Sequence, residues 1–129
     1  MRYGATMLPE SSNPVASILL VEDEILIAMQ VEYLLEDLGL GVAASVAGVA
    51  AAMAAIDIGG FDAAMLDVSL SADPVWPVAD RLADLGIPFL LCSGKVDDTP
   101  ARHSRVPVLR KPYSSDELKK ALVAVLPPH

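Results

Sequence analysis

Short apolar segments alternate with helix-like segments five times along this chain of 129 residues. The first apolar segment, residues 18–21, is apolar at every position and stops at the acidic residue Glu22. A strand that is apolar on both faces is typical of a central parallel strand, because helices cover both sides of such a sheet. The repeated alternation therefore predicts an α/β fold in which one parallel sheet lies between two helical layers.

Apolar runs and turn signals give the bounds of the expected elements. The predicted strands span residues 18–21, 42–46, 61–67, 87–92 and 106–109. The predicted helices span about 24–38, 48–57 and 76–85, and a last helix opens at 114–117 and closes before Pro127 and Pro128. Residues 93–105 are polar and only weakly helical, so we expect a short or irregular fourth helix that is mobile.

Composition narrows the domain organisation and the class of protein. Residues 1–17 have no apolar period and predict a disordered N-terminal tail, which leaves one domain over residues 18–126. A net charge of −8 argues against binding to nucleic acid. The single cysteine, Cys92, fits a reducing compartment. No apolar stretch approaches the length of a membrane span or resembles a secretory signal, so we expect a soluble, cytoplasmic protein without membrane contact.

Residues whose side chains can bind ligands or take part in a reaction follow four of the predicted strands. Glu22 and Asp23 follow the first strand, Asp67 ends the third, Ser93 follows the fourth and Lys111 follows the fifth. In parallel sheets ligands bind beyond the carboxyl ends of the strands, so we expect these side chains to converge on one crevice.

The residue types in this crevice suit phosphate chemistry. Three carboxylates repel one another unless a cation lies among them, and oxygen ligands with open coordination positions fit Mg²⁺. The ammonium of Lys111 and the hydroxyl of Ser93 suit phosphoryl oxygens. The chemistry implied is attack of the Asp67 carboxylate on phosphorus, which gives an acyl phosphate.

Each of these residues also has a structural interpretation when taken alone. Asp23 and Asp67 are of the type that caps a following helix, Ser93 is of the type found in turns, and Lys111 is of the type found on solvated surfaces. Cys92, Met65 and Trp76 are expected to be packing residues. The coincidence of suitable types at four strand ends favours the functional interpretation.

Four stretches resemble the receiver domains of two-component response regulators. They are residues 18–24 (ILLVEDE), 64–67 (AMLD), 92–94 (CSG) and 110–113 (RKPY), and the resemblance runs from about residue 18 to residue 126. It implies a flavodoxin-like (βα)5 three-layer sandwich with a parallel five-stranded sheet in the order 2-1-3-4-5.

The resemblance also implies a role for each site residue. Asp67 is the expected phosphoacceptor, and Asp23 is an expected direct Mg²⁺ ligand. Glu22 is expected to act through a metal-bound water, and the backbone carbonyl of Ser69 to complete the protein ligands.

On the opposite side of the site, Ser93 matches the hydroxyl residue that binds the phosphoryl group. Lys111 matches the lysine that pairs with that group, and the Lys111–Pro112 bond is expected to be cis.

Three positions depart from the common family pattern. Val108 stands where receivers usually carry an aromatic switch residue, Ser93 stands where Thr is commoner, and the segment before Lys111 is short. These features resemble those of an atypical subgroup of stand-alone response regulators. That subgroup has a Phe-Ala-Thr-Gly-aromatic motif at the fourth strand, and Lys95 stands here in place of the aromatic residue.

The resemblance implies a bacterial stand-alone phosphoacceptor that is not an enzyme beyond self-phosphotransfer and slow autodephosphorylation. Its expected partners are a histidine kinase or histidine phosphotransfer protein and an unidentified downstream protein. Only residues 127–129 follow the last helix, so we expect no output domain. We expect a monomer, with a dimer formed through the last helix as the alternative.

Two other functions stay open at this point. One is a receiver-like adaptor that signals without phosphorylation, which the departures at Val108 and before Lys111 favour mildly. The other is a phosphohydrolase of the haloacid-dehalogenase type, which would need an acid two residues after Asp67, where Ser69 stands.

Overall fold

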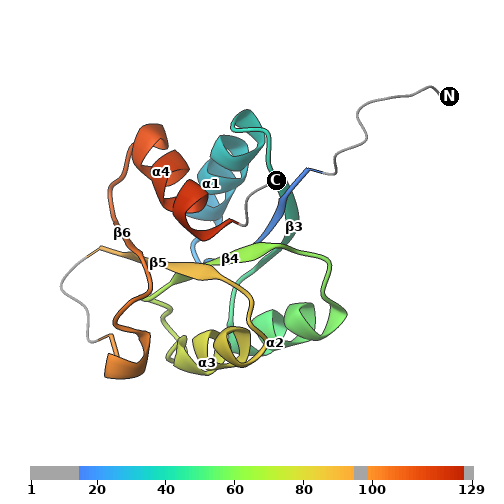
Figure 1. Cartoon of the computed structure of the whole chain (residues 1–129), viewed down its shortest axis with the longest axis vertical. Coiled ribbons are helices and arrows are strands. Elements are labelled where there is room, and N and C mark those ends of the chain that lie inside the picture. Colours follow the sequence, from blue (N-terminus) through green and yellow to red (C-terminus); the bar gives the residue numbers. More distant parts are fainter. Residues whose placement is uncertain (1–14, 95–98, 127–129) are drawn as a thin grey trace, which may run out of the picture.

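Five parallel strands form the centre of the protein in the order β3-β2-β4-β5-β6 (Figure 1). The computed structural model describes residues 15–94 and 99–126. The strands span Ser17–Val21 (β2), Gly41–Val46 (β3), Ala63–Asp67 (β4), Phe89–Ser93 (β5) and Val108–Arg110 (β6). Counted along the chain this is the order 2-1-3-4-5, and the predicted flavodoxin-like α/β fold is confirmed.

Helices cover both faces of the sheet. They span Ile25–Asp37 (α1), Val49–Ile58 (α2), Trp76–Asp84 (α3) and Ser115–Val125 (α4). Helices α1 and α4 lie on one face, and α2 and α3 lie on the other (Figure 1). In the part of the chain that the structure describes, no helix combines the length and the apolar character needed to cross a membrane.

Side chains of the central strands alternate between two apolar cores, as the period of a strand requires. In β4, Ala63 and Met65 pack toward α1 and α4, whereas Ala64 and Leu66 pack toward α2 and α3. All four are fully buried. The strand is therefore apolar at every position up to Asp67, where the chain reaches the edge of the sheet.

The first strand begins at Ser17, one residue before the predicted start. The Ser17 amide donates a hydrogen bond to Asp62 Oδ2 at 2.7 Å, and its hydroxyl donates to the Gly60 carbonyl at 2.9 Å. These bonds tie the start of β2 to the segment that leads into β4. Most of the predicted tail, residues 1–14, lies outside the described residues.

The start of α4 has the capping pattern that its sequence indicates. Ser114 Oγ accepts a hydrogen bond from the Glu117 amide at 3.1 Å, and Glu117 Oε1 accepts one from the Ser114 amide at 2.9 Å. Two amides that lack partners within the helix are thereby satisfied. This cap fixes where the chain turns from Lys111 into α4.

The segment between β5 and β6 carries a short 3-10 helix, Ala101–His103 (η1), where a fourth α-helix would stand. The expectation of a short or irregular element is confirmed for the described part of this segment. Residues 95–98 lie outside the described residues.

A buried histidine anchors η1 to the α2–α3 face of the sheet. His103 stacks on Trp76 with ring centroids 6.1 Å apart and meets the edge of Phe89 at 5.7 Å. Its Nε2 lies 2.7 Å from Asp80 Oδ1, which also accepts a bond from Arg102. The expectation that this segment is mobile rested on its polar sequence and did not consider the buried ring of His103.

Replacing His103 with Ala should lower the free energy of unfolding by about 2 kcal/mol, because it removes a buried ring and its aromatic contacts. Urea unfolding measures this change. Arg102→Ala is the matched control, since it removes an exposed partner of the same Asp80 and should have little effect. Equal losses in both variants would mean that the surface ion pair holds η1, rather than the buried ring.

Candidate functional site

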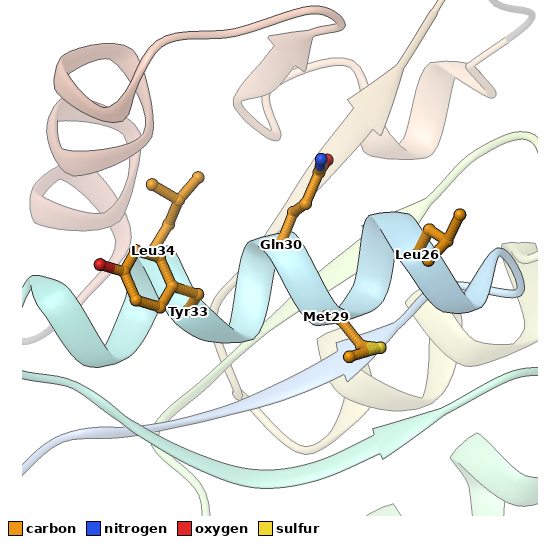
Figure 2. Close-up of a pocket in the computed structure, with 5 residues that line it drawn as sticks. All are labelled: Leu26, Met29, Gln30, Tyr33 and Leu34. Carbon is orange, nitrogen blue, oxygen red and sulfur yellow. The ribbon is translucent and has the colours of Figure 1, made fainter.

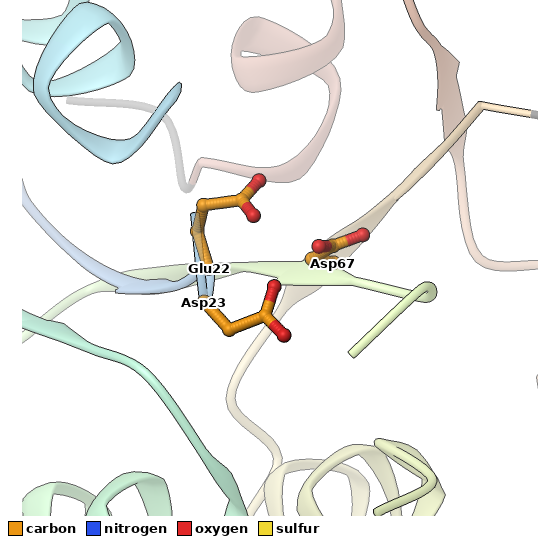
Figure 3. A group of neighbouring side chains, drawn as sticks. All are labelled: Glu22, Asp23 and Asp67. Carbon is orange, nitrogen blue, oxygen red and sulfur yellow. The ribbon is translucent and has the colours of Figure 1, made fainter. Parts of the chain in front are cut away.

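The polar residues at the strand ends lie together at the carboxyl edge of the sheet. Glu22 and Asp23 directly follow β2, and Asp67 is the last residue of β4. One carboxylate oxygen from each of these three residues lies within 4.8 Å of the others (Figure 3). The predicted convergence of the three acids is therefore present in the structure.

The alternation of strand side chains explains why Lys111 reaches these acids. Leu20, Met65 and Leu109 all belong to the core beneath α1 and α4, and Glu22, Asp67 and Lys111 each stand two residues further on. The ammonium of Lys111 lies 3.0 Å from Glu22 Oε1 and 3.4 Å from Asp67 Oδ1.

Carboxylate charge exceeds ammonium charge in this crevice. Glu22 and Asp67 are only 5% and 3% exposed, and Asp23 is partly buried. Among the described residues, Lys111 is the cationic side chain within ion-pair distance of Glu22 and Asp67. Three carboxylates thus share one ammonium.

The pKa values in the crevice reflect this imbalance. Burial raises the pKa of Glu22, and the neighbouring Asp67 carboxylate raises it further, whereas Lys111 only partly offsets them. Burial lowers the pKa of Lys111, but its bond to Glu22 and the charge of Asp67 together raise it above the ordinary value. Lys111 therefore remains charged at neutral pH, whereas ionisation of Glu22 carries a free-energy cost.

A divalent cation with oxygen ligands fits this donor set. Converging carboxylate oxygens are the ligands that Mg²⁺ accepts, and its charge would remove the excess of negative charge. Asp23 is less buried than the other two acids, so the cluster opens toward solvent on its side.

The loop after β4 is bonded to two of the acids. The Ser69 amide donates a hydrogen bond to Asp67 Oδ1 at 2.9 Å. Ser71 donates to Asp23 Oδ2 from its amide at 2.9 Å and from its hydroxyl at 2.7 Å. The sequence analysis did not identify Ser71, because nothing local marks a serine whose partner lies 48 residues away.

Ser93 and Lys111 are joined through the backbone at the far side of the crevice. The Lys111 amide donates to the Ser93 carbonyl at 2.8 Å, and Ser93 is almost fully buried. Ser93 follows Cys92, which pairs in register with Asp67. The Lys111–Pro112 bond is cis, as the resemblance implies. All five strand-end residues therefore lie at the same edge.

The structure also places Cys92 and Val108, two residues that the sequence analysis singled out. Burial raises the pKa of Cys92 to about 12, so its thiol is protonated at neutral pH and packs as a small apolar group. Val108, at the position expected for a switch aromatic, is an exposed residue at the start of β6. Lys95, the other departure noted in the sequence, lies outside the described residues.

An apolar surface on α1 adjoins the crevice. Leu26, Met29 and Tyr33 are each more than half exposed, and with Gln30 and Leu34 they line an open pocket (Figure 2). A second pocket of about 380 Å³ joins Gln30 and Leu34 of this helix to Gly94, Lys111, Pro112 and Tyr113. We call these two pockets the α1 surface; it extends from the outer face of α1 to Lys111.

Comparison with known proteins finds similar solved structures. No protein-family model and no curated protein matches the chain. SdrG from Sphingomonas melonis Fr1, known from a solution structure, is 44% identical over 85% of this chain and 95% of SdrG, with a TM-score of 0.77. A BeF3-activated conformation of SdrG is 45% identical over 84% of this chain and 93% of that chain, with a TM-score of 0.73.

Two further structures are described as receivers. The signal receiver domain of a modulated diguanylate cyclase from Desulfovibrio desulfuricans G20 is 30% identical over 87% of this chain and 94% of that domain, with a TM-score of 0.74. A response regulator receiver protein from Sinorhizobium medicae WSM419 is 28% identical over 85% of this chain and 93% of that protein, with a TM-score of 0.71.

The raised pKa of Glu22 predicts how stability depends on pH when no divalent cation is present. Because the folded state holds the Glu22 proton more tightly than the unfolded state, ionisation of this group destabilises the fold as pH rises from 4.5 through the raised pKa. Glu22→Gln should remove this part of the dependence. Thermal unfolding in the presence of a chelator measures this effect. The stability of the variant relative to the wild type should increase as pH rises across that window.

A difference in thermal stability between Glu22→Gln and the wild type that stays constant over this pH range would contradict the explanation. A gain that grows as pH falls would contradict it as well.

Proposed function

The chain belongs to the receiver domains of response regulators, and we propose that it is a stand-alone receiver that accepts a phosphoryl group on Asp67. The proposed donor is the phosphohistidine of a histidine kinase or of a histidine phosphotransfer protein. The observation that carries the proposal is the placement of Asp67, beside two further carboxylates and 3.4 Å from the Lys111 ammonium.

The proposed transfer uses the Asp67 carboxylate as the nucleophile. One carboxylate oxygen forms a bond to phosphorus while the phosphorus–nitrogen bond to the donor histidine breaks, and the histidine keeps the electron pair of that bond. Lys111, already between Glu22 and Asp67, is placed to bind the phosphoryl oxygens as Asp67 loses its own charge.

Mg²⁺ is the cofactor we propose for this reaction, with Asp23 and Asp67 as carboxylate ligands, the Ser69 carbonyl as a third and Glu22 acting through a water. When bound it would supply positive charge for the phosphoryl oxygens. The protein residues hold the acceptor in place: the Ser69 amide fixes Asp67 Oδ1, and the Glu24 amide donates to Glu22 Oε2 at 3.1 Å.

Signalling is proposed to follow from the new contacts of the phosphoryl group. Ser93 and Lys111 would bind it and draw the ends of β5 and β6 inward. This movement would shift the equilibrium between two conformations of the surface around η1 and α4. Val108 cannot provide an aromatic rotation, so the proposed output is movement of the β5–β6 segment. The output acts on another protein.

The α1 surface is the proposed docking site for the phosphohistidine partner. It leads from exposed apolar residues on α1 to Lys111, so a helical domain bound there would bring its histidine to the crevice. Apolar side chains of this size at the centre of an interface typically provide much of the binding free energy.

The proposal also covers the source, the location and the oligomeric state of the protein. We propose a bacterial, cytoplasmic monomer that binds neither nucleic acid nor membrane, since its net charge of −8 repels phosphate backbones. Beyond self-phosphotransfer and slow autodephosphorylation we propose no enzymatic activity.

Incubation with acetyl phosphate and Mg²⁺ should add the mass of one phosphoryl group to the intact protein. Asp67→Asn should abolish the adduct, because the amide is not a nucleophile toward phosphorus. Lys111→Ala should retain Asp67 but reduce the adduct, since it removes the cation beside the acceptor. Intact-mass spectrometry measures all three proteins, and an adduct of equal size in Asp67→Asn would place the phosphoryl group elsewhere.

Assays with small phosphate esters and with a phosphorylated kinase domain, added to this experiment, separate the rival functions. Catalytic release of phosphate from small phosphate esters would support a phosphohydrolase, although Ser69 stands where that chemistry needs an acid. An adaptor that signals by binding alone would form no adduct with acetyl phosphate or with a phosphorylated kinase domain.

The docking proposal predicts a selective effect of Leu26→Asp. The rate of phosphotransfer from a phosphorylated histidine-kinase domain that is active on the wild type should fall about tenfold, as expected for loss of an apolar anchor. Phosphorylation by acetyl phosphate should be unchanged. Ile58→Asp on α2, an equally exposed apolar position outside the α1 surface, is the control and should behave as the wild type. Equal slowing in both variants would contradict the assignment.

A further inference from the structure

Ser71 holds the carboxylate of Asp23 from across the crevice. Its amide and its hydroxyl both donate to the same oxygen, Oδ2, at 2.9 and 2.7 Å. The two donors lower the pKa of Asp23, with the hydroxyl as the larger cause. A carboxylate has about four acceptor positions on its two oxygens, so Asp23 keeps the capacity to bind a cation while Ser71 holds it.

Asp23 needs such support more than the other two acids. Glu22 and Asp67 are almost fully buried, and packing limits the positions that their side chains can take. Asp23 is only partly buried and stands two residues beyond the end of β2, where the sheet no longer constrains the chain. Ser71 supplies the constraint that packing does not.

The same contact fixes the loop between β4 and α3. The middle of this loop, residues 71–74, is exposed, whereas Val68, Leu70 and Val75 pack against the core beneath α2 and α3. The path of the exposed part therefore depends more on its polar contacts. The loop is bonded at Ser69 to Asp67 and at Ser71 to Asp23, and these bonds lie on either side of the Ser69 carbonyl. Mg²⁺ requires close to octahedral geometry, so ligands from β2, β4 and this loop must keep fixed relative positions.

We propose that Ser71 is a positioning residue of the magnesium site, which ties Asp23 and the β4–α3 loop into the arrangement that the cation requires. The inference rests on the proposed function, because it presumes that the three acids bind Mg²⁺. Ser71 itself contacts neither the cation nor the phosphoryl group; it acts through Asp23 and through the path of the loop.

Calorimetric titration of the full chain with Mg²⁺ tests this role. Ser71→Ala should raise the dissociation constant about tenfold, at the low end for groups that orient metal ligands, because the backbone amide remains. Ser71→Thr keeps the hydroxyl and should restore affinity. Ser104→Ala, another exposed serine, far along the chain in the segment after η1, is the matched control and should bind as the wild type.

Two further readouts separate positioning from a general structural role. The metal-free thermal midpoint of Ser71→Ala should fall only slightly, because the lost hydroxyl bond to Asp23 lies at an exposed position. In an Asp23→Asn background, Ser71→Ala should add no further loss of Mg²⁺ affinity, because the group that it positions is already changed.

Several results would overturn the inference. Unchanged Mg²⁺ affinity in Ser71→Ala, failure of Ser71→Thr to restore it, or an equal loss in the Asp23→Asn background would each show that Ser71 does not act through Asp23. A fall in the metal-free midpoint as large as that of His103→Ala would indicate a general structural role instead. Absence of Mg²⁺ binding by the wild type is a different result, since it would remove the proposed metal site as well.

Discussion

The contact between the Lys111 ammonium and the carboxylates of Glu22 and Asp67 is the interaction on which the site depends. Removing two nearly buried carboxylates from water is costly unless positive charge lies close to them. Lys111 supplies one such charge at 3.0 and 3.4 Å, while Asp23 adds a third negative charge nearby. The remaining imbalance makes the crevice receptive to a cation, and gives Lys111 a position from which it can bind an added phosphoryl group.

The sheet places these charges by a simple geometric rule. Residues two apart on a strand share a face, so Leu20, Met65 and Leu109 in one core lead to Glu22, Asp67 and Lys111 beyond it. This core carries α1 and α4, and the apolar α1 surface reaches Lys111 on the same side. The parallel register of the strands therefore places Asp67, Lys111 and the α1 surface on the same side of the sheet.

Much of this arrangement could be predicted from the sequence because its signals are local. Residues 18–21 and 63–66 are apolar at every position, which is typical of strands buried on both faces, and an acid follows each directly. Parallel connection then brings the strand ends to one edge. The short element between β5 and β6 was also visible as a polar, weakly helical stretch.

The features that the sequence did not reveal depend on partners that are distant along the chain. Ser71 lies 48 residues from Asp23, and His103 lies 23 residues from Asp80. Neither residue belongs to a periodic pattern. Their roles follow from the packing of loops across strand ends, which periodicity does not describe.

The central claim is that these side chains form one pocket that holds a cation and a phosphoryl group on Asp67. A crystal structure with Mn²⁺ and beryllofluoride tests it most directly, because Mn²⁺ is located by its anomalous scattering. We expect the cation at about 2 Å from carboxylate oxygens of Asp23 and Asp67, with beryllofluoride on Asp67 and the Lys111 ammonium against its fluorines. A cation bound elsewhere, or Lys111 directed away from an occupied Asp67, would contradict the claim.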